Sequence, residues 1–265
     1  DHGAMPSRTR SHARLLIDWV CIAVAIVGGA CISLIESAHR SFSLADAAIQ
    51  NPFHGDTVPM WIVYTLAYVL PIAHIVVASK LWLVELHESL IGFGLASALT
   101  VLFTNALKLV GRLRPDFLAT CVPDPSVVEA MRRNSTVLTD VVGWNICTQP
   151  DLKALSNGGK SFPSGHSSYM FVGMTYLALH LARELHTRGG SNVLRLFCVI
   201  VLPLFCAMLV AVSRVIDYRH HWSDALVGSL LGMASAYIGY RFYYPALSSS
   251  RYDSSFHAQQ LLLGH

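Results

Sequence analysis

Charged residues are scarce in this sequence: Asp, Glu, Lys and Arg make up 13% of its 265 residues, against about a quarter in a typical soluble domain. The deficit falls in long apolar blocks, and 53% of all residues are hydrophobic. A large soluble helical bundle would need amphipathic helices with one charged face, whereas these blocks are apolar all round. The composition therefore favours a membrane protein, and the length favours a single domain.

Features of several other protein classes are also lacking. The net charge of +3 is small, and no basic stripe with interleaved aromatic residues occurs, so we expect no nucleic-acid partner. There is no internal repeat, low-complexity tract or lipidation signal. The first apolar block is too long for a cleavable signal peptide and has no clear cleavage site after it. The leading residues 1–4 resemble residues left by cloning, with Met5 as the expected start.

The sequence does contain six apolar blocks that could cross a bilayer, which takes about 20 residues. They are Leu15–Ile35, Trp61–Ser79, Leu90–Val110, Ser168–Leu181, Val193–Val212 and Ala225–Tyr240. The fourth block is the shortest and has to use its polar flank to span. We therefore predict an all-α fold, an integral membrane bundle of six transmembrane helices over residues 15–244, with tails at 1–14 and 245–265.

Small residues recur within two of these blocks. The third block contains Gly92, Ala96 and Ser97, and the sixth contains Gly228, Gly232 and Ala236. Small residues at such spacing let helix backbones approach closely inside a membrane. We expect these positions to serve helix packing and not a cofactor.

An even number of spans places both chain ends on one side of the membrane. Arginines precede the first block and flank the turn between the fourth and fifth blocks, so the positive-inside rule predicts cytoplasmic tails. The long loop, residues 111–165, then faces the lumen or the exterior. We expect a multi-pass protein of the endoplasmic reticulum, Golgi or plasma membrane, and a homo-oligomer is compatible with the sequence.

Two features of the long loop fit an extracytoplasmic location. Asn134 begins an N-glycosylation sequon. Cys121 and Cys147 could pair in an oxidising compartment. The remaining cysteines lie in apolar blocks and are expected to be small core residues: Cys21, Cys31, Cys198 and Cys206.

Ionisable residues at membrane depth are costly, so they indicate function by default. They gather in three stretches, Lys108–Pro115, Gly159–Phe171 and Ser213–Asp224, each next to the end of an apolar block. Span parity places all three stretches at the same membrane face. We therefore expect them to form one site.

The first part of this site would bind an anion. Lys108, Arg114 and Arg214 could surround a phosphate, since arginine makes bidentate contacts with its oxygens. Ser164 and Gly165 stand just ahead of an expected helix and would offer backbone N–H groups to the same anion.

The second part would carry out the reaction. His220 and Asp224 are four residues apart and share a face on one helical turn. A carboxylate bonded to one ring nitrogen fixes the tautomer and leaves the other nitrogen as nucleophile or base. His166 remains to protonate a leaving oxygen. Together these residues suggest phosphoryl transfer through a covalent phosphohistidine.

Simpler interpretations exist for several of these residues. Lys108 alone could reach from a helix end to the interface without binding anything. Three arginines are expected to be solvated or to be charges on the side that carries the glycan: Arg112, Arg132 and Arg133. His74 and His180 lie singly on apolar faces and are expected to be packed or interfacial.

A metal site is the alternative for the catalytic histidines. His220 and His221 could form a metal-binding pair, with His166 and Asp224 completing the ligand set. However, adjacent histidines point in different directions on a helix, and the nearby cations would repel a metal ion. We therefore expect no metal and no cofactor.

The three stretches resemble the signature motifs of the type 2 phosphatidic acid phosphatase, or lipid phosphate phosphatase, superfamily. In words, these motifs are lysine, six residues, Arg-Pro; then Pro-Ser-Gly-His; then Ser-Arg, five residues, His, three residues, Asp. Pro163–His166 matches the second motif in full, and Ser213–Asp224 matches the third at the required spacing. The resemblance covers nearly the whole chain and is closest to the eukaryotic membrane enzymes.

The resemblance implies a role for each matching residue. His220 would be the nucleophile, Asp224 its orienting partner and His166 the acid that releases the alcohol. The phosphate would be held by Lys108, Arg114, Ser164, Gly165 and Arg214. The implied reaction is metal-independent hydrolysis of a phospholipid drawn from the bilayer, such as phosphatidate, lysophosphatidate, diacylglycerol pyrophosphate or a sphingoid-base phosphate.

One spacing departs from the family pattern, because five residues and not six separate Lys108 from Arg114. On an uninterrupted helix a spacing of seven returns to nearly the same face, whereas six falls about 100° short. Either Gly111 breaks the helix and the long lysine stem still reaches, or Lys108 is displaced.

Other activities share the same residues. A lipid phosphotransferase and a polyprenyl-diphosphate phosphatase remain alternatives, although the complete cationic set favours hydrolysis of a phosphomonoester. A non-enzymatic lipid-binding relative would be expected to lack His166, His220 or Asp224, and all three are present.

Overall fold

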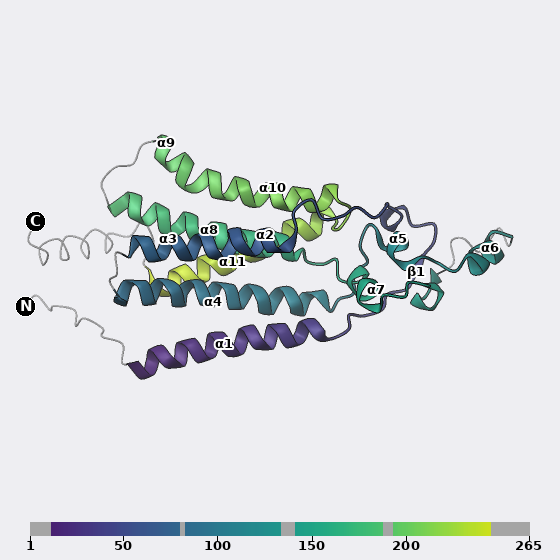
Figure 1. The fold of residues 1–265 in the computed structure, drawn as a ribbon, viewed down its shortest axis with the longest axis horizontal. Coiled ribbons are helices and arrows are strands. Elements are labelled where there is room, and N and C mark those ends of the chain that lie inside the picture. The colour runs from purple at the N-terminus through teal and green to yellow at the C-terminus, as the bar shows by residue number, and fades with distance from the viewer. Residues whose placement is uncertain (1–11, 80–82, 134–140, 188–192, 245–265) are drawn as a thin grey trace, which may run out of the picture.

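The structure is a computed structural model that describes residues 12–79, 83–133, 141–187 and 193–244. In this part of the chain, a bundle of long helices carries a small irregular cap at one end (Figure 1). The long helices are α1 (His12–Leu34), α4 (Leu83–Lys108), α8 (Gly165–Thr187), α10 (Leu202–Ile216) and α11 (Trp222–Tyr243). Residues 1–11 and 245–265 of the expected tails, and the predicted sequon at Asn134, lie outside the described residues.

Two further helical segments contain a π-helical turn. One consists of α2 (Met60–Tyr64), the π turn η2 (Thr65–Val69) and α3 (Leu70–Ala78), and the other of α9 (Val193–Leu196) and the π turn η4 (Phe197–Val201) ahead of α10. Each turn lies just before a proline, Pro71 or Pro203. Because proline lacks an N–H and clashes with the carbonyl four residues earlier, the wider turn lets each helix continue through it.

Four helical segments in the described part of the chain are long and apolar enough to cross a membrane: Leu15–Leu34, Met60–Ala78, Leu86–Lys108 and Val193–Ile216. The predicted fourth and sixth spans, which correspond to α8 and α11, are not among them. α8 packs against α4, α10 and α11, and none of its residues from Gly165 to Leu185 is exposed. A helix enclosed by other helices can carry polar residues, because they face the bundle interior and not lipid. The count of six spans stays a prediction.

Small residues of α11 let it lie directly against its neighbours, as expected from the sequence. A Cβ at Gly228 would lie 2.5 Å from the carbonyl oxygen of Ser164, and one at Gly232 would overlap that of Ser168. A Cβ at Gly239 would likewise overlap the carbonyl oxygen of Gly92 on α4. This close approach places the first turn of α8 beside the first turn of α11.

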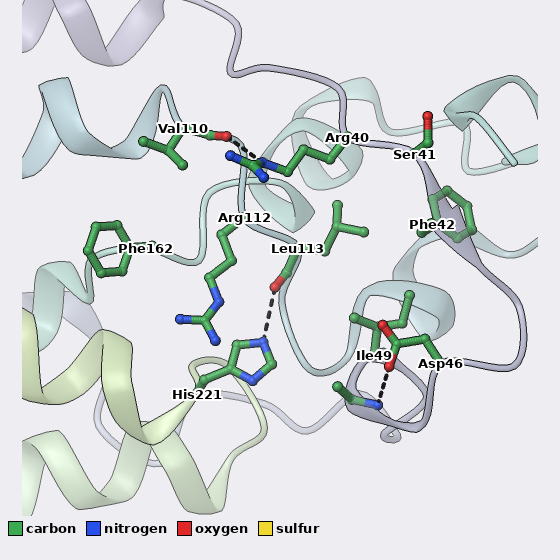
Figure 2. A pocket seen from close by; sticks show the side chains of 11 residues that line it. Arg40, Ser41, Phe42, Asp46, Ile49, Val110, Arg112, Leu113, Phe162 and His221 are labelled. Atoms are coloured by element: carbon green, nitrogen blue, oxygen red, sulfur yellow. Dashed lines mark hydrogen bonds between the residues drawn. The ribbon is translucent and has the colours of Figure 1, made fainter. Parts of the chain in front are cut away.

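The cap is formed by the loop before α2 and the segment between α4 and α8. It contains α5 (Phe117–Cys121), α6 (Pro125–Arg133), α7 (Leu152–Gly158), the 3-10 helices η1 (Ala47–Ile49) and η3 (Trp144–Ile146), and the strands β1 (Phe42–Ser43) and β2 (Val141–Val142). The two strands pair antiparallel, with Phe42 opposite Val142. A cavity of about 520 Å³ is lined by Phe42 of β1 and by Arg112, whose side chain points toward His221 near the start of α11 (Figure 2).

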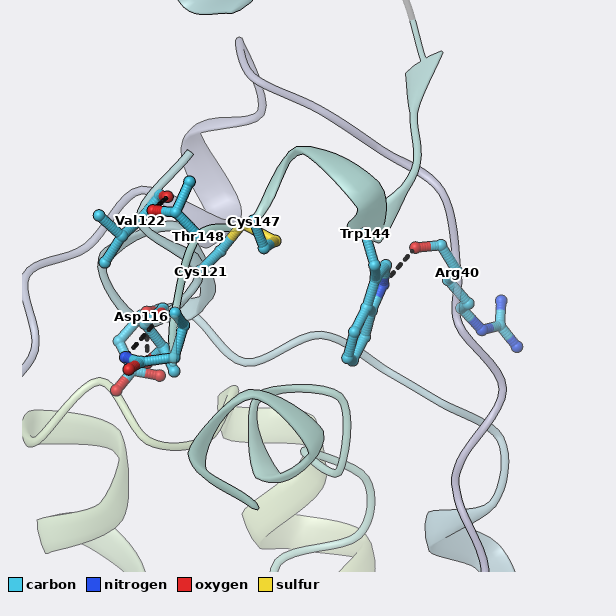
Figure 3. The surroundings of a disulfide bond; sticks show 9 residues. Arg40, Asp116, Cys121, Val122, Trp144, Cys147 and Thr148 are labelled. Atoms are coloured by element: carbon cyan, nitrogen blue, oxygen red, sulfur yellow. Dashed lines mark hydrogen bonds between the residues drawn. A yellow bond between two sulfur atoms is a disulfide. The ribbon is translucent and has the colours of Figure 1, made fainter. Parts of the chain in front are cut away.

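A disulfide bond joins Cys121 at the end of α5 to Cys147 after the short helix η3 (Figure 3). Nearby, Trp144 donates an indole hydrogen bond of 3.0 Å to the carbonyl oxygen of Arg40 (Figure 3). These links tie the long loop to itself and to the segment after α1. The cap is therefore a folded unit with its own apolar core around Phe117.

The other cysteines do not occupy the core, so that expectation was wrong. All four are exposed on the helices that carry them: Cys21, Cys31, Cys198 and Cys206. These helices belong to segments apolar enough to cross a membrane. Hydropathy alone does not distinguish a side chain covered by lipid from one covered by protein.

Candidate active site

The three polar stretches meet around one cavity of about 210 Å³ at the cap end of the bundle. Its walls carry four cationic side chains, two histidines and one carboxylate. These are Lys108, Arg114, Arg214, Arg219, His166, His220 and Asp56, and the lining is completed by Met60, Gly165 and Tyr169. The convergence predicted from the sequence is therefore present.

Lys108 reaches the cavity despite the short spacing of its motif. It is the last residue of α4, and the chain leaves the helix through Gly111, which has a φ of 75°. A Cβ at Gly111 would overlap the carbonyl oxygen of Ala38, so the turn requires glycine. The ammonium group of Lys108 donates to the carbonyl oxygen of Lys160 at 3.3 Å. The first of the two alternatives left by the sequence is the one observed.

Two of the arginines in the cavity wall are paired with carboxylates. Arg214 contacts Asp56 at 2.8 Å and Asp217 at 3.1 Å. Arg219 contacts Asp116 at 2.7 Å. The side chains of Arg214 and Asp116 are almost wholly buried, so these pairs hold the wall rigidly.

The other two cations have no such partner. Among the described residues, no carboxylate lies within 4.0 Å of the charged groups of Lys108 or Arg114. Arg114 instead donates to the carbonyl oxygen of Asn157 at 2.7 Å. Burial and the neighbouring Arg219 lower the pKa of Arg114 to about 9, which still leaves it charged at pH 7. Buried positive charge without a counter-ion is costly, and an anion in the cavity would relieve that cost.

His220 is held in a form suited to nucleophilic attack. It is 2% exposed, and its Nδ1 lies 2.7 Å from the carbonyl oxygen of Ser161, an acceptor that requires a proton on Nδ1. The unprotonated nitrogen is then Nε2. Burial, together with Arg114 and Lys108, holds the pKa of His220 well below its usual range, so the ring is neutral at pH 7.

Asp224 does not bond directly to His220, which differs from the predicted geometry. Its Oδ2 lies 4.0 Å from Nδ1 of the ring, beyond hydrogen-bond distance. Ser161 connects the two residues: its carbonyl oxygen accepts from His220 and its hydroxyl donates to Asp224 at 2.6 Å. Asp224 also accepts from the backbone N–H of His221 at 3.0 Å, as part of the N-terminal capping box of α11.

Arg112 was expected to be solvated, and that expectation was wrong. Its guanidinium contacts Asp224 Oδ1 at 2.6 Å and the hydroxyl of Ser223 at 2.8 Å. Arg112 also lines the larger cavity beneath the cap, together with His221 (Figure 2). The buried carboxylate of Asp224 is thus ion-paired with an arginine of the cap.

His166 lies in the first turn of α8 and lines the small cavity. Its Nε2 is 3.1 Å from the carbonyl oxygen of Val58, so this nitrogen carries a proton. Nδ1 is then the nitrogen that can exchange a proton with a bound molecule.

The two residues before His166 differ in what they offer. The N–H of Ser164 donates to the carbonyl oxygen of Asp224 at 3.0 Å, so the prediction that this group is open to a phosphate was wrong. The hydroxyl of Ser164 accepts from the N–H of Ser167 at 3.4 Å, and Ser164 is not part of the cavity wall. Gly165 does line the cavity, and the described hydrogen bonds leave its N–H at the helix N-terminus without an acceptor.

Sequence reasoning missed several residues of the site. Asp56 and Arg219 line the cavity, and Ser161 holds His220. A signal existed for Asp56, since it is an acidic residue only four positions before the start of α2. Thr57 fixes this loop by donating its backbone N–H to Asp217 at 2.9 Å.

Comparison with known proteins identifies the family of the chain. The pattern of the PAP2 superfamily matches residues 89–247. The chain belongs to this superfamily. The matched PAP2 region contains every site residue predicted from the sequence, from Lys108 to Asp224, and it leaves out Asp56.

Similar proteins carry related names. Lipid phosphate phosphatase 2 of Arabidopsis thaliana is 33% identical over 250 residues, which cover 92% of this chain and 80% of that protein. Lipid phosphate phosphatase 1 of the same plant is 32% identical over 250 residues, covering 92% and 71%. Diacylglycerol pyrophosphate phosphatase 1 of Saccharomyces cerevisiae is 35% identical over 216 residues, covering 78% and 72%. No solved structure matches the chain at a significant level.

Proposed function

We propose that this PAP2 protein is a membrane lipid phosphate phosphatase that hydrolyses phosphomonoesters through a phosphohistidine on His220. The observation that carries the proposal is a neutral, buried histidine beside two cations that lack counter-ions, in one small cavity. The named relatives act on lipid phosphates and on diacylglycerol pyrophosphate. Both facts favour a phosphorylated lipid as substrate.

In the first step, Lys108, Arg114 and the N–H of Gly165 bind the phosphate oxygens. Nε2 of His220 attacks phosphorus, so a P–N bond forms while the P–O bond to the lipid alcohol breaks. Burial and Arg214 lower the pKa of His166 to about 4, so the ring takes up its proton when the phosphate dianion binds beside it, and it then gives this proton to the leaving oxygen. The phosphorylated ring keeps its proton on Nδ1 and becomes cationic, and the carbonyl of Ser161 and the nearby charge of Asp224 stabilise it.

In the second step, water attacks the phosphohistidine. The P–N bond breaks, a P–O bond to water forms, and His166 takes the proton that water loses. Inorganic phosphate leaves, and His220 returns to its neutral form. No metal ion takes part in either step.

The position of the cavity suits a lipid. It lies where the ends of α4, α8 and α10 meet the cap, and α4 and α10 belong to apolar segments. A phosphate can therefore reach the cavity while the acyl chains stay in the bilayer. Phosphatidate, lysophosphatidate, diacylglycerol pyrophosphate and sphingoid-base phosphates all meet this requirement.

The topology proposed with this function is six spans with cytoplasmic tails. The disulfide bond in the cap is typical of an oxidising compartment. The active site would then face the lumen or the exterior of the cell, in the endoplasmic reticulum, the Golgi or the plasma membrane.

The proposal can be tested with the full chain purified in detergent. We expect phosphate release from phosphatidate to continue in EDTA, to be inhibited by vanadate, and to fall by at least about a thousandfold in His220→Ala. His39→Gln is a matched control, because His39 is an exposed histidine of the cap. Full activity in His220→Ala, or an absolute need for magnesium, would exclude this mechanism. The same assay on a panel that includes a polyprenyl diphosphate would identify the preferred substrate.

A further inference from the structure

A second group of potential ligands lies far from the phosphate cavity. His74 of α3 meets His180 and Glu184 of α8 near the end of the bundle opposite the cap. His180 is fourteen residues along α8 from His166, or about 21 Å at 1.5 Å per residue. The sequence suggested isolated histidines here, because the two lie 106 positions apart and only the packing of α3 on α8 joins them.

The spacing of the three groups matches the coordination shell of a metal ion. His74 Nε2 lies 3.3 Å from His180 Nδ1 and 3.3 Å from Glu184 Oε1, and His180 Nδ1 lies 3.7 Å from the same oxygen. Tetrahedral zinc with bonds of about 2.0–2.2 Å holds its ligand atoms about 3.3–3.6 Å apart. Two imidazoles and one carboxylate are a ligand set that zinc uses in proteins.

The hydrogen bond that joins the two histidines of this cluster is long. The Nε2 of His180 lies 3.3 Å from the hydroxyl of Ser89, so a proton there leaves Nδ1 as an acceptor. His74 can then supply the proton of this bond, but the 3.3 Å between its Nε2 and His180 Nδ1 is longer than the usual distance of about 2.7–3.2 Å. A cation at the centre would satisfy all three atoms at once.

The surroundings also resemble those of a bound metal. Metal-binding histidines usually have their other ring nitrogen held by a polar group, and Ser89 provides this for His180. Ser89 is itself fixed, because the hydroxyl of Tyr176 donates to its carbonyl oxygen at 2.8 Å. The side chains of His74 and Glu184 are 19% and 25% exposed, so an ion can enter from one side.

We propose that His74, His180 and Glu184 bind one zinc ion, which joins α3 to α8 at the end of the bundle opposite the phosphate cavity. Water would complete the coordination at the open side. The ion stabilises the packing of these two helices and takes no part in phosphate chemistry.

The test uses the full chain without an affinity tag, purified in detergent and dialysed against trace zinc. We expect about one zinc per chain by elemental analysis, and a melting temperature that rises by about 5 °C or more on adding zinc to the EDTA-treated protein. His74→Gln and Glu184→Gln should each lose the bound zinc and the thermal shift. Their side chains keep hydrogen-bonding groups, so a cluster held only by hydrogen bonds would leave the thermal behaviour nearly unchanged.

Two further variants make the result decisive. His39→Gln is the matched control, since His39 forms an exposed pair with Glu36 at 2.9 Å and should keep the full zinc content. Ser89→Ala should keep zinc but bind it about 10–100-fold more weakly. Zinc-free wild-type protein that does not respond to added zinc, or equal zinc in wild type and His74→Gln, would overturn the proposal. Phosphate release is not measured, so an inactive chain would not affect this outcome.

Discussion

Replacing Arg112 with methionine should destabilise the protein far more than replacing another arginine of the cap. Arg112 is the ion-pair partner of Asp224, whose side chain is fully buried, at 2.6 Å. Methionine keeps much of the apolar stem but removes the charge. The carboxylate would then be buried with only the hydroxyl of Ser161 and the N–H of His221 as donors.

The magnitude follows from the exposure of the two partners. Breaking a fully buried ion pair costs about 3–5 kcal/mol. Here the side chain of Arg112 is 39% exposed and Asp224 keeps two hydrogen-bond donors. The loss of stability should therefore be closer to the contribution of a hydrogen bond to a charged group, about 1.5–3 kcal/mol. About 2 kcal/mol corresponds to a melting temperature lower by about 4–8 °C.

The matched control is Arg133→Met. Arg133 pairs with Glu129 at 3.3 Å, and the two side chains are 78% and 55% exposed. Such a pair contributes about 0.5 kcal/mol or less. Thermal unfolding of both variants in the same detergent should separate them clearly. Equal melting temperatures for the two variants would refute the buried ion pair, as would a double-mutant cycle with Asp224→Asn that shows no coupling.

Three further results are expected. Because the pKa of His220 is lowered in the folded state, the unfolded chain binds more protons below about pH 6.5. Stability should therefore fall as the pH drops through that value, and His220→Asn should flatten the slope in pH-dependent unfolding; an unchanged slope would contradict the shift. Replacing Cys121 and Cys147 together by serine should cost about 3.5 kcal/mol for a sequence separation of 26, measured by denaturant unfolding, and a reductant should no longer affect the variant. Gly111→Ala should cost at least about 2 kcal/mol, because its φ is positive and its Cβ would overlap a carbonyl oxygen. Gly28→Ala, with open space around it, should be neutral or stabilising in the same unfolding assay.

The general layout of the site could be predicted from the sequence because its parts adjoin the ends of apolar blocks. His166, His220 and Arg214 each lie within a few residues of a helix end, so span parity alone brings them to one face. The contacts that refine the site join residues far apart in the chain. Arg112 meets Asp224 across 112 positions, and Asp56 meets Arg214 across 158. No local pattern carries that information.

The helices could be predicted more reliably than their surroundings. Apolar blocks mark each long helix, but they do not show which helices lie at the centre of the bundle. α8 has no exposed residue between Gly165 and Leu185, and it tolerates His180 and Glu184 in its last turns, which makes it less apolar than the outer helices. Conversely, Cys21 and Cys206 lie in strongly apolar helices and are exposed. Hydropathy measures how favourably a side chain leaves water, and burial in lipid or in the protein interior removes it from water equally.

The position of Lys108 shows where counting residues along a helix stops being informative. The six-residue step to Arg114 falls about 100° short of the family spacing only if the helix continues through both residues. Here α4 ends at Lys108 itself, and the chain turns at Gly111 before it reaches Arg114. Once the helix has ended, the direction of Arg114 is set by the cap, through the bond from its backbone N–H to the carbonyl oxygen of Gly158. The one residue by which the spacing is shorter than in the family therefore shortens the turn after α4 and does not rotate Arg114 to another face of a helix. Lys108 and Arg114 both still line one cavity.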